Sequence, residues 1–336
     1  MTIALIIIVA FALFLYAYKE WDYDISRYNI VANLEDINTT NLGAWYTDIE
    51  EKYPAQEHFD TNGIPLIDHE GKVEAYCNPV TIAWYALSAF EHFIKTNDEK
   101  AKQDFFLQAD WLVKNAHETK EGFTVWQYEK APAGVSDVRD HWVSAMAQGL
   151  GISVLTRAYQ QTGEDRYLKA VHNAMKSFRY DADEGGVRSR EDGIFYEEIQ
   201  SKQNWHILNG FITSLLGLYD CYRATGDTEA RDLFKAGIKT LELNLTRYDT
   251  GFWSRYSFYG VKKWPFFWEP LATMHYHNEH IAQLKVLSLL TGKKAFEVMA
   301  EKWDGYQHSI SCRVLHFFYA KFLFRIQRIH FHLFQG

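Results

Sequence analysis

The chain of 336 residues has few cysteines and no excess of basic charge. Its three cysteines, Cys77, Cys221 and Cys312, have neither metal-ligand spacing nor an even number, so they indicate neither a zinc site nor a disulfide framework. The formal net charge is −8 and the sequence pI is about 6.0, whereas a general nucleic-acid binder needs a basic face. We therefore expect no nucleic-acid partner, and we expect no metal or other cofactor.

One long apolar run stands at the start of the chain, from Ile3 to Tyr18. It is short for a membrane span and closer in length to the core of a signal peptide. However, no basic stretch precedes it, and no small-x-small cleavage site follows before Lys19-Glu20-Trp21. We interpret residues 1–18 as an uncleaved single-pass anchor, with the rest of the chain on the extracytoplasmic or lumenal side. Lys19 alone is weak evidence for that orientation.

A helix-to-helix hinge recurs four times after residue 79, with no Pro-, Gly- or Ser-rich linker between the copies. Gly or Asn at such a hinge can adopt the left-handed conformation, and an acid beside it can cap the next helix. A regular hairpin repeat of this length predicts stacked helix pairs. We therefore expect a mainly α fold, an α/α toroid or barrel of about four hairpins. The copies are Thr96-Asn97-Asp98, Thr162-Gly163-Glu164, Thr225-Gly226-Asp227 and Thr291-Gly292-Lys293, with threonines 66, 63 and 66 residues apart.

The repeat also suggests a division of the chain. Residues 19–75 form a lead-in with short strands, 76–310 one toroid domain, and 311–336 a basic aromatic helix. Strand-like segments at 123–128, 186–198 and 251–259 connect the pairs and should gather as short β-hairpins at one end of the ring. The tail has no acid from Gly305 onward. It either packs on the ring as a closing helix or lies on a membrane surface.

Two adjacent carboxylates, Glu197 and Glu198, end an aromatic-rich stretch that begins at Gly193. Soon afterwards comes a helix, predicted from Ile207 to Tyr222, that is apolar on nearly every side. Such a helix is buried on several sides, so a carboxylate pair at its entrance faces a pocket, where active sites tend to lie. The alternative is that both are solvated loop acids.

Several blocks along the chain resemble the D-glucuronyl C5-epimerases, also called heparosan-glucuronate epimerases. Any one block is weak evidence, but their order from about Cys77 to Arg313 is fairly specific. The blocks are Ser144-Ala145-Met146-Ala147-Gln148-Gly149, Tyr196-Glu197-Glu198, Asn209-Gly210-Phe211, Ser214-Leu215-Leu216-Gly217-Leu218-Tyr219-Asp220, Gly251-Phe252-Trp253-Ser254-Arg255-Tyr256 and Tyr276-His277-Asn278-Glu279-His280-Ile281.

The resemblance implies an α/α-barrel domain that inverts carbon 5 of D-glucuronic acid, or of a related uronic acid, in a polysaccharide. That reaction needs a base on one face of the sugar, an acid on the other, and donors for the enediolate. Glu198 matches the family's catalytic glutamate, and Tyr256 and Tyr276 match its tyrosines. As isolated residues, the two tyrosines would be interpreted as buried aromatics with satisfied hydroxyls. We expect substrate contacts from Tyr196, Glu197, Asn209, His277, His280, Trp142, Gln148 and Arg255.

Two departures from the family pattern affect this interpretation. The family has a tyrosine directly after the second glutamate, where this chain has Ile199. Three positions after Tyr256, the animal enzymes carry an arginine that we would expect to bind the substrate carboxylate, and this chain has Tyr259. The missing cation could come from Arg255, Lys262 or Lys263.

Other functions remain open on the sequence alone. A lyase on a similar toroid would abstract the same proton and then eliminate the glycosidic bond, and a glycan-binding or assembly protein would do neither. The cluster His275, His277, Glu279 and His280 could hold a metal, although histidines at a helix start are more often structural, and the family does not catalyse through a metal there. The substrate glycan is not determined, and a homodimer is left open.

Overall fold

The computed structural model describes residues 39–49, 52–67, 75–131, 138–258 and 270–319. The run Ile3–Tyr18 and the departure at Tyr259 lie outside these ranges, as do Lys262 and Lys263. Within the described residues, no helix is both long enough and apolar enough to cross a membrane.

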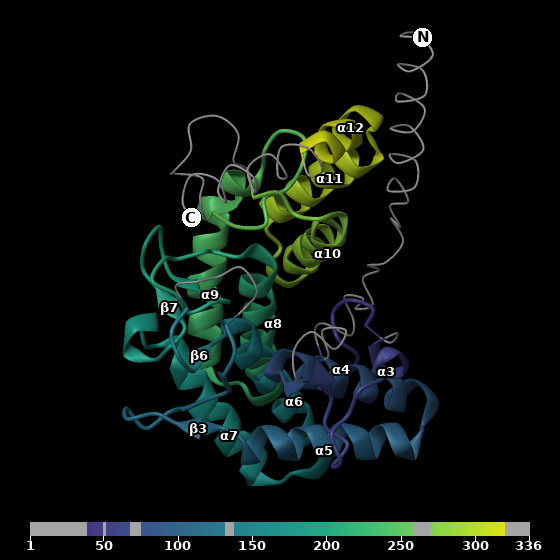
Figure 1. Ribbon diagram of the computed structural model, residues 1–336, viewed down its shortest axis with the longest axis vertical. Helices are drawn as coiled ribbons and strands as arrows, with labels where there is room; N and C mark the ends of the chain where they lie inside the picture. Colours follow the sequence, from purple (N-terminus) through teal and green to yellow (C-terminus); the bar gives the residue numbers. More distant parts are fainter. Residues whose placement is uncertain (1–38, 50–51, 68–74, 132–137, 259–269, 320–336) are drawn as a thin grey trace, which may run out of the picture.

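Four helical hairpins follow one another along the chain, as the repeat predicts (Figure 1). Each inner helix packs on the next, α4 on α6, α6 on α8 and α8 on α10. Short helices precede and follow them, α3 (Lys52–Ala55) and α12 (Ile310–Phe318). The hairpins are α4 (Pro79–Thr96) with α5 (Glu99–Lys114), α6 (Ala145–Thr162) with α7 (Asp165–Met175), α8 (Leu208–Thr225) with α9 (Thr228–Asn244), and α10 (Met274–Thr291) with α11 (Lys294–His308).

The hinge residues end the inner helices as predicted. Asn97, Gly163, Gly226 and Gly292 are the C-caps of α4, α6, α8 and α10, and all four have left-handed backbone, with φ between 59° and 74°. The acids beside them cap the next helix in two cases, because the Asp98 and Asp227 side chains accept from backbone N–H groups of α5 and α9. Glu164 stands at the same position before α7 without a side-chain cap.

The closest approach of two helices joins α6 to α8. A Cβ on Gly149 would lie 2.5 Å from the Ser214 Cα, and one on Gly217 would lie 2.0 Å from the Gly149 carbonyl oxygen. Both positions therefore admit only glycine at this separation.

The hairpins form an arc rather than a closed ring in the described part of the chain. α10 does not pack on α4 in the way that α4 packs on α6, and the two helices stand apart in Figure 1. The segment 39–49 lies inside the arc instead. The Ser88 hydroxyl of α4 donates to the Ile49 carbonyl at 2.6 Å, and Tyr46 and Ile49 are buried in the main core.

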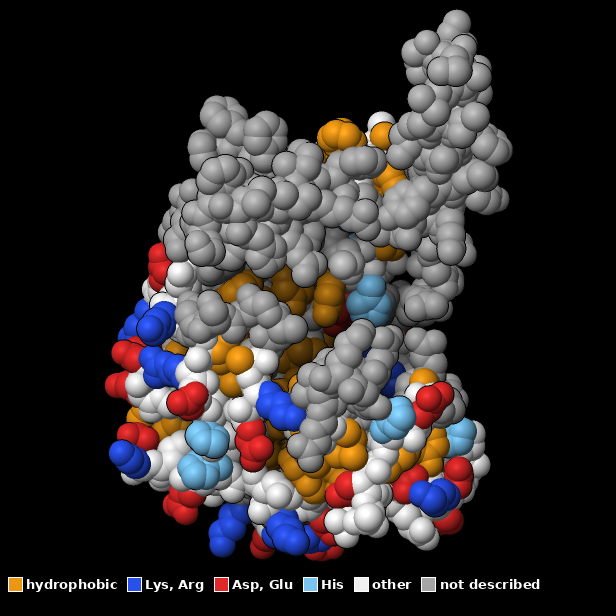
Figure 2. All heavy atoms as spheres, viewed as in Figure 1, with side chains coloured by type: hydrophobic (Ala, Val, Ile, Leu, Met, Phe, Trp, Pro, Cys, Tyr) orange, Lys and Arg blue, Asp and Glu red, His pale blue; other side chains and the backbone are white. Residues whose placement is uncertain are grey.

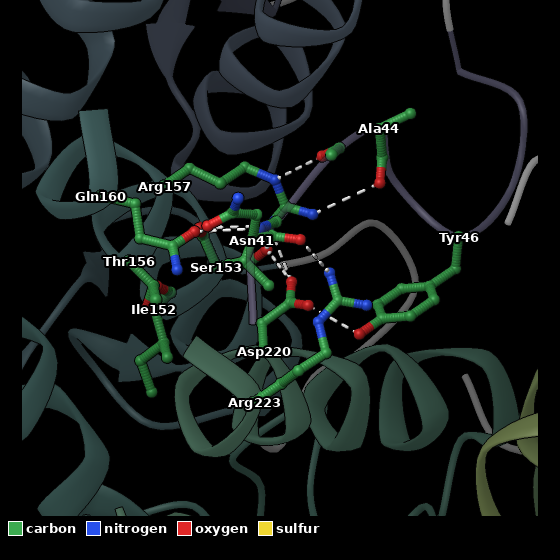
Figure 3. A network of polar contacts seen from close by, with 12 residues as sticks. Asn41, Ala44, Tyr46, Ile152, Ser153, Thr156, Arg157, Gln160, Asp220 and Arg223 are labelled. Carbon is green, nitrogen blue, oxygen red and sulfur yellow. Dashed lines mark hydrogen bonds and ion pairs between the residues drawn. The ribbon is translucent and has the colours of Figure 1, made fainter. Parts of the chain in front are cut away.

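A buried polar network holds this segment against α6 and α8 (Figure 3). Arg157 of α6 donates to the Gly43 carbonyl at 3.0 Å and pairs with Asp220 of α8 at 2.7 Å. The Tyr46 and Ser153 hydroxyls each donate to Asp220 at 2.6 Å. Because Arg157 and Asp220 are paired with each other and hydrogen-bonded, the network fixes this segment against the C-terminal halves of α6 and α8.

Short antiparallel pairs of strands precede the first hairpin and lie in the connections after it. β1 (Leu66–Ile67) pairs with β2 (Tyr76–Cys77), β3 (His117–Glu118) with β4 (Thr124–Val125), β5 (Gln127–Tyr128) with β6 (Trp142–Val143), and β7 (Arg188–Ser189) with β8 (Phe195–Tyr196). The expected strand at 251–259 was wrong over its described residues. These form turns with isolated bridges, from Asp249 to Ser254 and from Arg255 to Leu271.

The connections collect at the N-terminal ends of the inner helices, and two of them bind the start of the preceding inner helix. The amide N–H of Ala145, which begins α6, donates to the Glu197 carbonyl at 2.9 Å. The amide of Leu208, which begins α8, donates to the Tyr256 carbonyl at 3.0 Å. The connections therefore fix their side chains at one end of the arc.

Helix α12 covers part of the expected C-terminal helix and packs on the arc by one side. The His316 ring stacks on Trp253 at 4.2 Å and donates to the Ala272 carbonyl at 3.1 Å. Its other side exposes apolar side chains, which show as hydrophobic surface near the top of Figure 2. They are Ile310, Val314, Leu315 and Phe318.

Candidate active site

Glu198 lies where the connection after β8 meets the start of α8. A Cβ on Gly210 would lie 1.9 Å from Glu198 Oε2, so the carboxyl group rests directly on the first turn of the helix. Oε2 is buried and accepts no hydrogen bond from the described residues. Burial, together with the nearby Glu279 and Glu197, raises the pKa of Glu198 to about 8, and the Gly210 amide acts in the opposite direction.

Tyr256 and Tyr276 form a pair beside this carboxyl group. Their ring centroids are 4.8 Å apart, and their hydroxyls are hydrogen-bonded to each other. Burial raises the pKa of both tyrosines, and the charge of Glu198 raises both further. Residues from two separate connections therefore meet at Glu198, and both hydroxyls stay protonated at neutral pH.

A second carboxyl group, Glu279, lies one turn after Tyr276 on α10. It is only 9% exposed, and burial raises its pKa to about 7 against the opposing effects of Lys52 and Asn209. Asn209, at the start of α8, hydrogen-bonds the Glu279 carboxylate, while the Asn209 Oδ1 atom is buried without a partner in the described structure. The two carboxyl groups thus sit over neighbouring residues of one helix start.

Aromatic rings form the wall next to these groups. Tyr128 of β5 stacks on Trp142 of β6 with centroids 4.1 Å apart, and both belong to a small cluster with Ile199, against which Tyr256 packs. Glu198 is close enough to raise the pKa of Tyr128, after burial as the main cause. Ile199 therefore forms part of an apolar wall where the family has a hydroxyl. Figure 2 shows a recess with hydrophobic and acidic side chains on one face of the molecule.

Four of the expected substrate contacts point elsewhere. Glu197 faces the opposite way from Glu198, where it accepts from Ser189 Oγ at 2.5 Å and lies 2.7 Å from His206 Nδ1. The remaining three make structural hydrogen bonds. They are Tyr196 to the Leu233 carbonyl, Gln148 to the Thr124 and Ala174 carbonyls, and Arg255 to the Arg247 and Asp249 carbonyls.

His277 and His280 also lie away from the group, on the side of α10 that faces Ser254. The Ser254 hydroxyl contacts His277 Nδ1 at 2.8 Å and His280 Nδ1 at 3.0 Å, and His277 Nε2 donates to the Trp303 carbonyl at 3.0 Å. Burial lowers the pKa of both histidines, that of His277 to about 3. No cluster of three or more His, Cys, Asp or Glu side chains within the described ranges could hold a metal ion.

A groove of about 580 Å³ lies elsewhere, between α9 and the C-terminal ends of α8 and α10. Tyr219, Tyr222 and Phe234 line it, together with Lys235 and Lys239. It contains none of the residues around Glu198. We assign the site to the carboxyl and tyrosine group, because only acid–base groups could carry the expected proton transfer.

The class of the protein follows from this arrangement. Helical hairpins in an arc carry two carboxyl groups and a tyrosine pair at the N-terminal ends of the inner helices. Residues 120–305, more than half of the chain, match the family described as D-glucuronyl C5-epimerase C-terminus. The chain belongs to this family, which confirms the resemblance inferred from the sequence blocks.

A curated relative agrees with the family match. The chain is 34% identical over 223 residues to the D-glucuronyl C5-epimerase of Caenorhabditis elegans. That similarity covers 62% of this chain and 36% of the relative, so the chain spans about a third of the relative's length.

Solved structures show the same fold at low sequence identity. A sugar epimerase from a ruminal bacterium has a TM-score of 0.55 and 12% identity, over 75% of this chain and 66% of its own. A D-mannose isomerase has a TM-score of 0.51 and 14% identity, over 76% of this chain and 66% of its own.

Three residues near the group were not expected to act there. The sequence blocks indicate Glu279 only as a candidate metal ligand. However, Tyr276, Glu279 and Gln283 recur at helical spacing and form a polar stripe on an inner helix, which is a signal in the sequence. Tyr128 and Lys52 belong to no motif. Only the packing of β5 and α3 brings them near the carboxyl groups.

Proposed function

We propose that this protein epimerises carbon 5 of uronic acid residues in a polysaccharide, with D-glucuronic acid as the leading candidate. The observation that carries the proposal is the environment of Glu198. Its carboxyl group lies at a helix start beside the Gly210 amide and next to two protonated tyrosines, and its Oε2 atom is buried without a hydrogen-bond partner among the described residues. A base whose pKa lies near the working pH is well suited to abstract a weakly acidic proton.

In this proposal the Glu198 carboxylate removes the proton from carbon 5. The electrons of the broken C–H bond move into the sugar carboxylate, which becomes an enediolate. The Tyr276 hydroxyl then returns a proton to the opposite face of carbon 5, and solvent restores both side chains. Tyr256 donates to the enediolate, and the N-terminal end of α8 favours negative charge nearby. Trp142 and Tyr128, which are buried and stacked on each other, form the wall next to the sugar.

The test is incorporation of solvent deuterium at carbon 5 in a panel of uronate polymers that includes heparosan. Glu198→Gln keeps the shape and removes the base, so exchange should fall at least about 100-fold, the effect typical of a positioned proton transfer. Tyr276→Phe should have an effect of similar size. It should leave glycan binding nearly intact, since one hydroxyl contributes about 1 kcal/mol to a typical hydrogen bond.

The same assay separates the competing functions. A lyase would produce an unsaturated, ultraviolet-absorbing sugar end, and a glycan-binding protein would give neither product nor exchange. Exchange that survives both substitutions would show that Glu198 and Tyr276 do not carry the reaction.

We also propose that residues 1–18 anchor the protein to a membrane, with the catalytic part on the extracytoplasmic or lumenal side. The support is the apolar run Ile3–Tyr18 and the polar sequence after it. A chain beginning near Trp21 should stay soluble without detergent. If the full chain is equally soluble without detergent, the anchor is wrong.

A further inference from the structure

The groove between α9 and the C-terminal ends of α8 and α10 lies at a junction that the hairpin packing leaves open. Between the first two hairpins, the outer helix α5 packs on both α6 and α7. Among the described residues, α9 makes no comparable contact with α10 or α11, although α9 and α10 both pack on α8. The groove of about 580 Å³ therefore lies over α8, between the third and fourth hairpins.

One face of α9 forms the first wall of the groove. Its lining side chains recur three, four, seven, eight and eleven residues after the first, which is the spacing of a single helix face. At 1.5 Å per residue, this wall is about 16 Å long. The face is mostly basic, with two apolar side chains between the charged ones. Its members are Arg231, Phe234, Lys235, Ile238, Lys239 and Glu242.

The second wall comes from the ends of two inner helices. Tyr219 and Tyr222 stand in the last two turns of α8. Leu290 stands near the end of α10, and Lys293 lies in the hinge after it. The Tyr219 ring packs on Phe234 with centroids 5.0 Å apart and on Tyr222 with centroids 6.2 Å apart. Both tyrosines are half-buried, so part of each ring is open to a ligand in the groove.

The groove is positively charged, although the protein has a net charge of −8. Its lining holds four cationic side chains and one carboxylate. Arg231 pairs with the carboxylate of the next residue at 2.9 Å, and Lys293 pairs with Glu242 at 2.7 Å. Lys235 and Lys239, one turn apart on α9, are exposed and form no ion pair with a described carboxylate. Their two ammonium groups are therefore available to an anionic ligand.

Aromatic rings beside free lysines select the chemistry of that ligand. Sugar rings pack their C–H faces against aromatic side chains, and the carboxylates of uronic acids pair with ammonium groups. A neutral glycan would leave the lysines unused, a small anion would leave the tyrosine rings uncovered, and an acidic peptide would use the lysines alone. A linear anionic sugar chain uses both the rings and the row of lysines.

We propose that this groove binds a stretch of an anionic uronate polysaccharide, as a second glycan-binding site apart from the carboxyl and tyrosine group. The choice of a uronate polymer rests on the proposed function, which makes such a chain the substrate. The two sites lie at opposite ends of α8, a helix of 18 residues, so about 27 Å of helix separates them. A sugar chain in the groove therefore does not contact Glu198.

The experiment is carbon-13 NMR of the full chain labelled in its tyrosine rings, with a short heparosan oligosaccharide added. The two relevant signals are those lost in Tyr219→Phe and in Tyr222→Phe. Both should shift and saturate with the heparosan oligosaccharide, and neither should shift with an uncharged maltooligosaccharide of the same length. In a chain carrying Lys235→Gln and Lys239→Gln, the affinity read from these shifts should fall about tenfold, as expected for the loss of two exposed charge pairs.

The matched control carries Lys114→Gln and Lys169→Gln. It removes the same charge from exposed positions on the outer helices α5 and α7, outside the groove. Its affinity should equal that of the unaltered chain. The proposal is overturned if the two signals do not shift, if both double variants weaken binding equally, or if the uncharged oligosaccharide shifts the signals as much. Polyglutamate that binds as tightly as heparosan would assign the groove to acidic peptides and overturn the glycan.

Deuterium exchange into heparosan separates this inference from the proposed function. Shifts of Tyr219 and Tyr222 without any exchange would contradict the function and support the groove as a glycan site. Exchange that requires Glu198, with both tyrosine signals unmoved, would contradict this inference alone. If both are right, the variant with Lys235→Gln and Lys239→Gln keeps the kcat of the unaltered chain, because the groove contains none of the residues around Glu198.

Discussion

Two carboxyl groups, the buried Asp220 and the half-buried Glu198, lie towards opposite ends of α8, and their surroundings are built in opposite ways. Asp220, in the C-terminal half of α8, meets Arg157 and accepts hydrogen bonds from Tyr46 and Ser153 (Figure 3). Glu198, at the start of the same helix, has no cation within ion-pair distance among the described residues, and its Oε2 atom accepts no hydrogen bond from them. A satisfied buried charge holds structure together, whereas an unsatisfied one costs stability and remains available to a ligand.

The largest expected effect concerns Asp220, the carboxylate that has a cation and hydrogen-bond donors. Arg157→Met leaves Asp220 buried without its cation, so the free energy of unfolding should fall by about 3–5 kcal/mol in denaturant titrations. Arg231→Met is the control, because that arginine pairs with Asp232 at the surface and its loss should change little. If the free energy of unfolding falls equally in the two variants, the buried ion pair stabilises the fold no more than the exposed one.

Gly210→Ala tests how tightly Glu198 rests on α8. The added Cβ would lie 1.9 Å from Glu198 Oε2, so the carboxyl group must move. Overpacking of this kind costs about 1–3 kcal/mol of stability. Because Glu198 is displaced, deuterium exchange at carbon 5 of the substrate should fall as well. Gly217→Ala is the control in the same helix, since its Cβ would meet the Gly149 carbonyl instead. That control should lose stability and keep the Glu198 titration midpoint in place.

Replacing the unsatisfied carboxyl group should stabilise the fold. At pH 8, Glu198→Gln should raise the free energy of unfolding by about 0.5–2 kcal/mol, as is common where function has kept a site away from its stability optimum. Glu197→Gln should lower it, because Ser189 and His206 already bond that carboxylate. If both substitutions lower stability, Glu198 is a structural acid like Glu197.

A further expected effect is a pH dependence of stability above pH 6.5. The folded pKa values of Glu198 and Glu279, about 8 and 7, lie above their ordinary value of 4.5. Their stabilising effect is therefore complete below pH 4.5 and is lost as the pH rises towards 8. His277 and His280 have lowered pKa values and are neutral in both states above 6.5, so they do not mask this window.

The melting temperature should therefore fall between pH 6.5 and 8, and the fall should be smaller in a chain carrying both Glu198→Gln and Glu279→Gln. A slope that is unchanged in that double variant would assign the pH dependence to other groups.

The sequence by itself determined the hairpin repeat, its left-handed hinges and the family. These features are local: the hinge conformation needs only Gly or Asn at one position, and the family blocks are short runs of neighbouring residues. The sequence also predicted that Glu198, Tyr256 and Tyr276 lie at one end of the fold, because all three stand at the starts of inner helices or in the connections before them.

Only the tertiary structure decided which side chains near those motifs face the site. Glu197 and Glu198 are neighbours, yet one carboxylate turns towards His206 and the other towards Gly210. On α10, His277 and His280 turn towards Ser254, while Glu279 turns towards Asn209. Which face of a helix or strand meets the site depends on how neighbouring elements pack. Lys52 and Tyr128 reach the carboxyl groups from parts of the chain far away in sequence, and only the folded arc brings them there.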